Sequence, residues 1–175
     1  LSEPFSTSKR LTKLRQILTA QKIAGFIVPL ADEHQGEYVP NFAQRLAWLT
    51  GFTGSAGLAI VLTDKAAIFV DGRYTLQARE QVDNELFEIN HSVDNPPAAW
   101  IADNLKSGEK LGFDPWLHTS DSLVQFRKAC DKSGAKLEEQ NSNPVDAVWD
   151  NQPPPPLTPV VPHDIRFTGQ SSAEK

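Results

Sequence analysis

Cysteine is almost absent from this sequence, since Cys130 is the only one among 175 residues. A single cysteine excludes an internal disulfide and any metal site built from several cysteines. Phe126 and Ala129 accompany it on a predicted helix, which favours a buried core thiol over a nucleophile. A chain without disulfides is typical of a reducing compartment, so we expect a cytoplasmic protein.

Long hydrophobic runs and an excess of positive charge are missing too. The longest apolar stretches, such as Leu58–Leu62, have the length of a strand, whereas a membrane-spanning helix needs about 20 residues. Charged side chains interrupt the first 25 positions, so no signal peptide is predicted. The formal net charge of −5 argues against a nucleic-acid partner. Neither a membrane nor a nucleic acid is therefore expected as a partner.

Motifs that carry catalytic chemistry are also absent. None of the four histidines lies in HExxH or another close ligand pair, and the sequence has no GxSxG motif and no P-loop. Asp103 and Asp114 have the eleven-residue spacing found in many dimetal peptidases, but the other ligands of such a site are missing. Coincidence is the preferred reading of that pair. No catalytic and no metal-ligating residue is assigned.

Apolar periodicity alternates between helical and strand-like along the first 150 residues. The predicted helices cover about 7–21, 73–82, 98–105, 120–133 and 143–149. The predicted strands cover about 25–30, 56–63, 66–71, 86–90, 110–114 and 135–140. Strands separated by helices of this length predict an α/β domain over residues 1–150, with helices on both faces of the sheet. The tight turn at 63–65 predicts an antiparallel hairpin, which makes the sheet mixed.

Composition changes sharply after residue 150. Four consecutive prolines occupy 153–156, and Pro159 and Pro162 follow closely. Prolines cannot occupy a helix interior or a central strand, so 151–166 is predicted to be a stiff, extended linker. Residues 167–175 are too few for a unit of their own. We expect them to be the start of a second, truncated domain of a longer chain.

A glycine-rich segment at 51–57 resembles a phosphate-binding loop at first sight. It lacks the lysine that would neutralise phosphate, and it precedes a strand instead of opening a helix. We therefore interpret its glycines as positions of tight turns and close backbone contact.

The most site-like feature is the run Asp71, Gly72, Arg73 and Tyr74. It follows an apolar strand and precedes a helix, which places a guanidinium near the carboxyl ends of the strands, where open α/β sheets bind ligands. Arginine can hold a carboxylate or a peptide carbonyl through two parallel hydrogen bonds. From these residues alone, a structural ion pair between Arg73 and Asp71 is the more frequent alternative.

Six segments in order along the chain resemble the N-terminal domain of the long-form, cytosolic-type aminopeptidase P family. They are 32–38 (DEHQGEY), 49–57 (LTGFTGSAG), 70–74 with 77–78 (VDGRY, QA), 112–115 (GFDP), 143–149 (NPVDAVW), and 167–171 with 174–175 (FTGQS, EK). Each motif is weak by itself, and the signal comes from their number and order over almost the whole chain.

This resemblance implies a ribonuclease-H-like creatinase/prolidase N-terminal fold that does not itself catalyse. Such enzymes remove the N-terminal residue from peptides with proline second, using two divalent metal ions, usually manganese, in a downstream catalytic domain. They are commonly homodimers whose N-terminal domains help pairing and restrict access to the active site. The resemblance implies that Arg73 contacts the Xaa-Pro substrate, whereas Asp71 and Tyr74 brace the turn. Glu37, Tyr38 and the 51–57 loop receive only structural roles.

Two alternatives stay open at this point. The domain is either part of a proline-specific exopeptidase or a creatinase-like binding module that stands alone and has no peptidase activity. A third reading makes it the N-terminal domain of a prolidase or a creatinase. The QGEY, GSAG and DGRY segments together favour aminopeptidase P.

Overall fold

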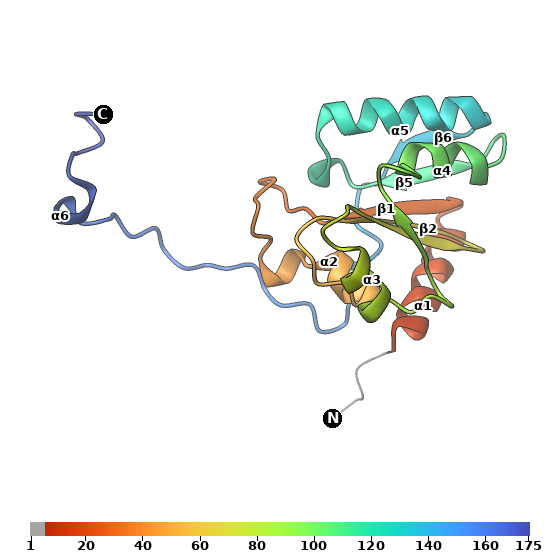
Figure 1. Cartoon of the computed structure of the whole chain (residues 1–175), viewed down its shortest axis with the longest axis horizontal. Coiled ribbons are helices and arrows are strands. Elements are labelled where there is room, and N and C mark those ends of the chain that lie inside the picture. Colours follow the sequence, from red (N-terminus) through yellow and green to blue (C-terminus); the bar gives the residue numbers. More distant parts are fainter. Residues whose placement is uncertain (1–5) are drawn as a thin grey trace.

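The computed structural model describes residues 6–175 and forms one six-stranded sheet with helices packed on it (Figure 1). Its helices are α1 (Thr7–Ala20), η1 (Asn41–Ala43), α2 (Arg45–Thr50), α3 (Thr75–Gln81), α4 (Pro97–Asn104), η2 (Pro115–Leu117), α5 (Ser120–Ser133) and α6 (Ile165–Thr168). Its strands are β1 (Gly25–Pro29), β2 (Leu58–Leu62), β3 (Ala66–Val70), β4 (Glu88–His91), β5 (Lys110–Phe113) and β6 (Lys136–Glu139).

The strands lie in the order β4-β3-β2-β1-β5-β6. Strand β2 pairs antiparallel with both β1 and β3, whereas β3 with β4, β1 with β5, and β5 with β6 pair parallel. All strands except β2 therefore run in the same direction, and their carboxyl ends meet at one edge of the sheet. This confirms the predicted hairpin and the mixed sheet.

Two hydrophobic cores cover the two faces of the sheet. On β1, Phe26 and Val28 pack in the core that contains α1 and α2, whereas Ile27 between them faces the core that contains α4 and α5. This alternation follows from the two-residue period of a strand, which sends neighbouring side chains to opposite faces. Every residue of β1 is buried, as expected for a strand covered on both sides. The predicted α/β class with helices on both faces is confirmed.

The boundaries of α5 follow from local capping. Thr119 precedes the helix and its hydroxyl accepts a hydrogen bond from the backbone N–H of Ser122 at 3.3 Å. Gly134 ends the helix at φ +76°, a backbone conformation that glycine adopts without steric cost. By contrast, Ser6 precedes α1 without making a side-chain capping bond, so α1 depends on burial of Leu11, Leu14 and Leu18.

The prediction of a helix over 143–149 is wrong, because this segment forms a series of turns. The side chain of Asn143 accepts a hydrogen bond from the backbone N–H of Val145 at 3.0 Å, and Pro144 lies between them. The short helices η1 and α2 between residues 41 and 50 had no prediction, because six residues are too few to show a helical period. The segment that leaves the domain after residue 152 has no regular structure before α6 (Figure 1).

No helix in the described part of the chain combines the length and the apolar character that crossing a bilayer requires. The division into a domain, a linker and the start of a second domain remains a prediction.

Candidate functional site

The Asp71–Tyr74 turn lies at the edge of the sheet where the parallel strands end. Asp71 follows β3 directly, and the backbone N–H of Tyr74 donates to the carbonyl oxygen of Asp71 at 3.0 Å, which closes the turn before α3. The carboxylate of Asp71 also accepts from the backbone N–H of Arg73 at 2.9 Å. The turn therefore takes two residues that had been expected in the helix, and α3 begins at Thr75.

The carboxylate of Asp71 holds the guanidinium of Arg73 from one side. The distance from Nη2 of Arg73 to Oδ2 of Asp71 is 2.8 Å, and Nε lies 3.1 Å from Oδ1. These hydrogen bonds lower the pKa of Asp71 and raise the pKa of Arg73. The Arg73 side chain is nevertheless 67% exposed, so a held and oriented cation faces solvent at this edge. The structural ion pair and a ligand-binding role are thus compatible.

Tyr74 connects the turn to the glycine-rich loop. Its hydroxyl lies 2.5 Å from the hydroxyl of Ser55, and this hydrogen bond lowers the pKa of Tyr74. The guanidinium carbon of Arg73 lies 5.1 Å from the centre of the Tyr74 ring, which permits a cation–π contact. The ring of Phe52 meets the ring of Tyr74 edge-on, with the two ring centres 5.7 Å apart. Tyr74 therefore braces the turn from the side of the loop.

Gly54 of the 51–57 loop occupies a position where a side chain would collide with this aromatic pair. A Cβ atom on Gly54 would lie 2.3 Å from Cζ of Phe52 and 2.8 Å from Cδ1 of Tyr74. Gly51 ends α2 at φ +83°. These contacts confirm the interpretation of the loop as tight turns and close packing.

Replacing Gly54 by alanine should lower the free energy of unfolding by about 1–3 kcal/mol, because the new methyl group has to displace a buried aromatic ring. Urea unfolding followed by circular dichroism measures the change. Gly36→Ala is the matched control, because a Cβ there meets its nearest atom, Oδ2 of Asp32, at 3.4 Å. Equal stability of the two variants would contradict the packing argument.

A set of polar side chains ties the loop to α3 through contacts that the sequence did not predict. The backbone N–H of Thr53 donates to Oε1 of Gln81 at 2.9 Å, and the amide of Gln77 donates to the Thr53 hydroxyl at 3.1 Å. Gln77 and Gln81 are four residues apart and so lie on one side of the helix. Only the tertiary contact with the loop gives them a role.

Glu37 and Tyr38 lie in a different loop, organised by the buried carboxylate of Asp32. That carboxylate accepts from the backbone N–H groups of His34 and Gly36, both at 3.0 Å. Tyr38 is 88% exposed. No hydrogen bond among residues 6–175 joins Glu37 or Tyr38 to the Asp71–Tyr74 turn.

Asp103 and Asp114 belong to no group of three or more potential metal ligands among the described residues. Asp103 lies on α4, whereas both oxygens of Asp114 accept hydrogen bonds, from the backbone N–H of Trp116 at 3.0 Å and from the side chain of Asn143 at 2.9 Å. Within the described residues, no group of three or more His, Cys, Asp or Glu side chains could hold a metal ion. Burial raises the pKa of the Cys130 thiol to about 11, which is consistent with the predicted core residue.

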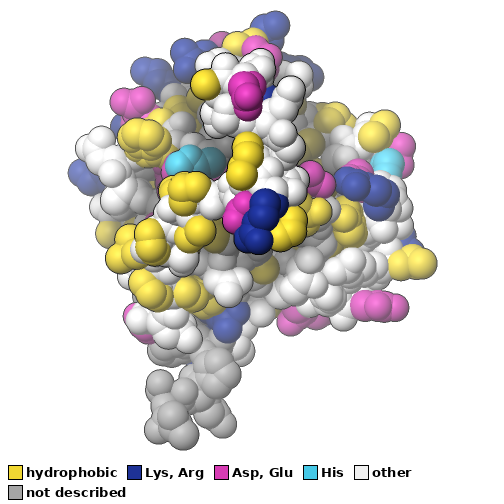
Figure 2. All heavy atoms as spheres, turned by 90° about the vertical axis from the view of Figure 1, so that its left-hand side faces the viewer, with side chains coloured by type: hydrophobic (Ala, Val, Ile, Leu, Met, Phe, Trp, Pro, Cys, Tyr) yellow, Lys and Arg dark blue, Asp and Glu magenta, His cyan; other side chains and the backbone are white. Residues whose placement is uncertain are grey.

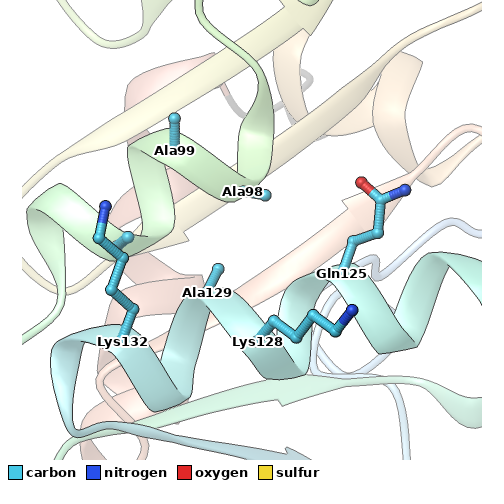
Figure 3. Close-up of a pocket in the computed structure, with 7 residues that line it drawn as sticks. Ala98, Ala99, Gln125, Lys128, Ala129 and Lys132 are labelled. Atoms are coloured by element: carbon cyan, nitrogen blue, oxygen red, sulfur yellow. The ribbon is translucent and has the colours of Figure 1, made fainter.

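A groove between α4 and α5 lies on one outer face of the molecule (Figure 3). Ala98, Ala99 and Ala129 form its apolar part, and the side chains of Lys128 and Lys132 border it. Its lining has no histidine, cysteine, serine or carboxylate side chain. The Asp71–Tyr74 turn therefore remains the candidate site.

Known proteins resemble this chain over nearly its whole length. The sequence profile of the creatinase/prolidase N-terminal domain matches residues 10–145. A probable Xaa-Pro aminopeptidase P of Ajellomyces dermatitidis is 38% identical over 175 residues, which cover 98% of this chain and 28% of that protein. Human Xaa-Pro aminopeptidase 2 is 37% identical over 172 residues, which cover 97% of this chain and 25% of that protein.

A solved structure of similar fold is the X-prolyl aminopeptidase of Caenorhabditis elegans, described as a cytosolic enzyme with a di-nuclear active site. The TM-score is 0.85 at 28% sequence identity, and the match covers 97% of this chain and 30% of that one. The chain thus spans between a quarter and a third of the length of each relative.

Proposed function

This chain belongs to the creatinase/prolidase N-terminal domain family, and on that premise we propose that it is the non-catalytic N-terminal domain of an Xaa-Pro aminopeptidase. The observation that carries the proposal is the match over nearly the whole chain to Xaa-Pro aminopeptidases of a fungus and of humans. In this proposal residues 1–150 form the domain, 151–166 the linker, and 167–175 the start of a second domain.

The chemistry of peptide cleavage belongs, in this proposal, to a catalytic domain in the remainder of the parent chain. Two divalent metal ions, for which we propose manganese, would activate water and polarise the scissile carbonyl there. The described residues do not fit such a centre, because no three His, Cys, Asp or Glu side chains among them form a group that could hold a metal ion. We therefore assign no catalytic step to this domain.

Arg73 is the residue that we propose as the domain's contact with the Xaa-Pro peptide. Asp71 occupies Nε and Nη2 of its guanidinium, so the side chain is fixed in direction while most of its surface stays exposed. A guanidinium held in this way can donate to a peptide carbonyl or carboxylate with little loss of side-chain entropy. The domain would also narrow the entrance to the active site and contribute to a homodimer in the cytoplasm.

Replacing Arg73 by alanine in the intact enzyme should lower kcat/KM for an Xaa-Pro peptide by about 10-fold, which corresponds to about 1.4 kcal/mol. Steady-state hydrolysis measures the loss. Arg166→Ala is a matched control, because Arg166 makes the same hydrogen bonds to Asp164 and is also exposed. Unchanged kinetics of a folded Arg73→Ala enzyme would exclude the substrate contact.

The proposed function as a whole is tested by hydrolysis of an Xaa-Pro-Xaa peptide in the presence of Mn²⁺. The 175-residue chain and its longer parent are compared at equal concentration. We expect activity in the parent and none in this chain. Activity of the chain by itself would overturn the non-catalytic role, and inactivity of both would favour the stand-alone binding module.

A further inference from the structure

A small polar cavity lies at the same edge of the sheet as the Asp71–Tyr74 turn, next to the ends of β5 and β6. Its volume is about 280 Å³. Its walls are Asp114 and Trp116 after β5, Glu139 at the end of β6, and the loop of residues 140–143. The cavity is distinct from the proposed substrate contact, since none of the residues of the Asp71–Tyr74 turn lines it. We call it the Trp116 pocket.

Two carboxylates of the Trp116 pocket lack a cationic partner within residues 6–175. Asp114 accepts only from neutral donors, the backbone N–H of Trp116 and the amide of Asn143. Glu139 makes no ion pair there, although its neighbour Glu138 pairs with Lys110 at 2.7 Å. The third acid, Asp146, is neutralised by Arg45. The pocket thus carries about two negative charges that the described residues leave uncompensated.

His118 does not compensate these charges at neutral pH. Asp114 acts on it electrostatically, but burial lowers the pKa of His118 to about 4. Its imidazole is therefore neutral above about pH 5. The uncompensated charge of the pocket therefore favours a cationic ligand over a neutral or anionic one.

Trp116 supplies the apolar wall, and it is unlike the buried tryptophans of the domain. Trp116 is 74% exposed, whereas Trp100 is 3% and Trp149 8% exposed. Figure 2 shows one face of the molecule, on which exposed hydrophobic side chains stand in several separate groups among the charges. Exposed indoles are common at binding surfaces, because a ligand that covers the flat ring buries a large apolar area and so gains binding free energy.

Uncompensated carboxylates beside an exposed indole match a planar cationic group. We propose that the Trp116 pocket binds the guanidinium of an arginine side chain presented by a polypeptide partner. The planar cation stacks on the indole of Trp116 while its N–H groups donate to Glu139 and to acceptors of the 140–143 loop. Lysine is the poorer match, because a compact ammonium has three donors and no flat face. This inference is independent of the proposed peptidase role.

The test is a titration of the 175-residue chain with the blocked peptide acetyl-Gly-Arg-Gly-amide, followed by NMR. The signal of the Trp116 indole N–H and the backbone amides of residues 140–142 are expected to shift in a saturable manner. The same peptide with citrulline in place of arginine is the neutral analogue, of nearly the same shape, and should bind at least 10-fold more weakly. A lysine peptide should bind less tightly than the arginine peptide.

Two variants assign the binding to the pocket. Glu139→Gln should weaken binding of the arginine peptide by at least 3-fold. Trp116→Ala should abolish the shifts of the 140–142 backbone amides. Glu80→Gln is the matched control, because Glu80 is an exposed acid on α3, far in sequence from the pocket. This variant should bind the arginine peptide with unchanged affinity. Absence of saturable shifts, or equal binding of the arginine and citrulline peptides, would overturn the proposal.

Discussion

Replacing Asp146 by alanine should destabilise the domain by about 3 kcal/mol, the loss typical of removing one partner from a buried ion pair. Nε and Nη2 of Arg45 donate to the two carboxylate oxygens of Asp146 at 2.7 and 2.8 Å. The Arg45 side chain is only 10% exposed, so without Asp146 its charge would remain inside the protein with no counter-charge. The amide of Gln152 would lose its bond to the same carboxylate.

The neighbouring pair of Lys13 and Asp150 provides the control for this experiment. Its atoms lie 3.3 Å apart, and both side chains are well exposed. Exposed pairs contribute less than about 1 kcal/mol, so Asp150→Ala should leave the urea midpoint nearly unchanged. Urea unfolding at neutral pH, followed by circular dichroism, compares the two variants. Similar small losses in both would mean that solvent reaches Arg45 and that the buried pair contributes little.

Acidification from pH 6.5 to pH 4 should cost the domain up to about 3 kcal/mol through His118 alone. Burial between the rings of Phe113 and Phe126 disfavours the charged imidazole, which lowers its pKa from 6.5 to about 4 in the folded state. Between these values the unfolded chain binds more protons than the folded one, so stability falls as the pH falls. Above pH 6.5 and below pH 4 this contribution no longer varies with pH.

His118→Phe isolates this contribution. Nε2 of His118 is buried without a hydrogen-bond partner in the protein, so an apolar ring can take its place without stranding another polar group. The unfolding free energy of the native protein should fall more steeply from pH 7 to pH 4 than that of His118→Phe, so that the difference between the two proteins changes by up to about 3 kcal/mol. His163→Gln, an exposed residue in the tail, serves as the control. Parallel curves for the native protein and His118→Phe would contradict the buried neutral histidine.

The predicted strands and long helices agree with the structure because their signals are local. Leu11, Leu14 and Leu18 repeat with the period of a helix, and all three are buried under the sheet. The run Leu58–Leu62, the tight turn and the run Ala66–Val70 predict a hairpin from adjacent residues alone. By contrast, α2 and the turns of 143–149 depend on contacts between segments that are far apart in sequence.

The segment 143–152 shows why such contacts escape a reading along the chain. The rings of Trp48 and Trp149 stack with their centres 5.2 Å apart, although about a hundred residues separate them. The guanidinium carbon of Arg10 lies over the Trp48 ring as well, 4.9 Å from its centre. Nothing in the local pattern of these residues indicates which partners they meet, so a short helix was predicted where packing favours turns.

The candidate site likewise has features that the sequence predicts and features that only the tertiary structure sets. The sequence by itself determined that Arg73 follows a buried strand and a glycine, next to the aspartate that pairs with it, because turn chemistry acts over a few residues. The contact between Tyr74 and Ser55, the bonds from Gln77 and Gln81 to Thr53, and the pocket beside Trp116 were decided by the tertiary structure alone. The physical reason is that local propensity sets the elements, whereas long-range packing sets which side chains meet at their ends.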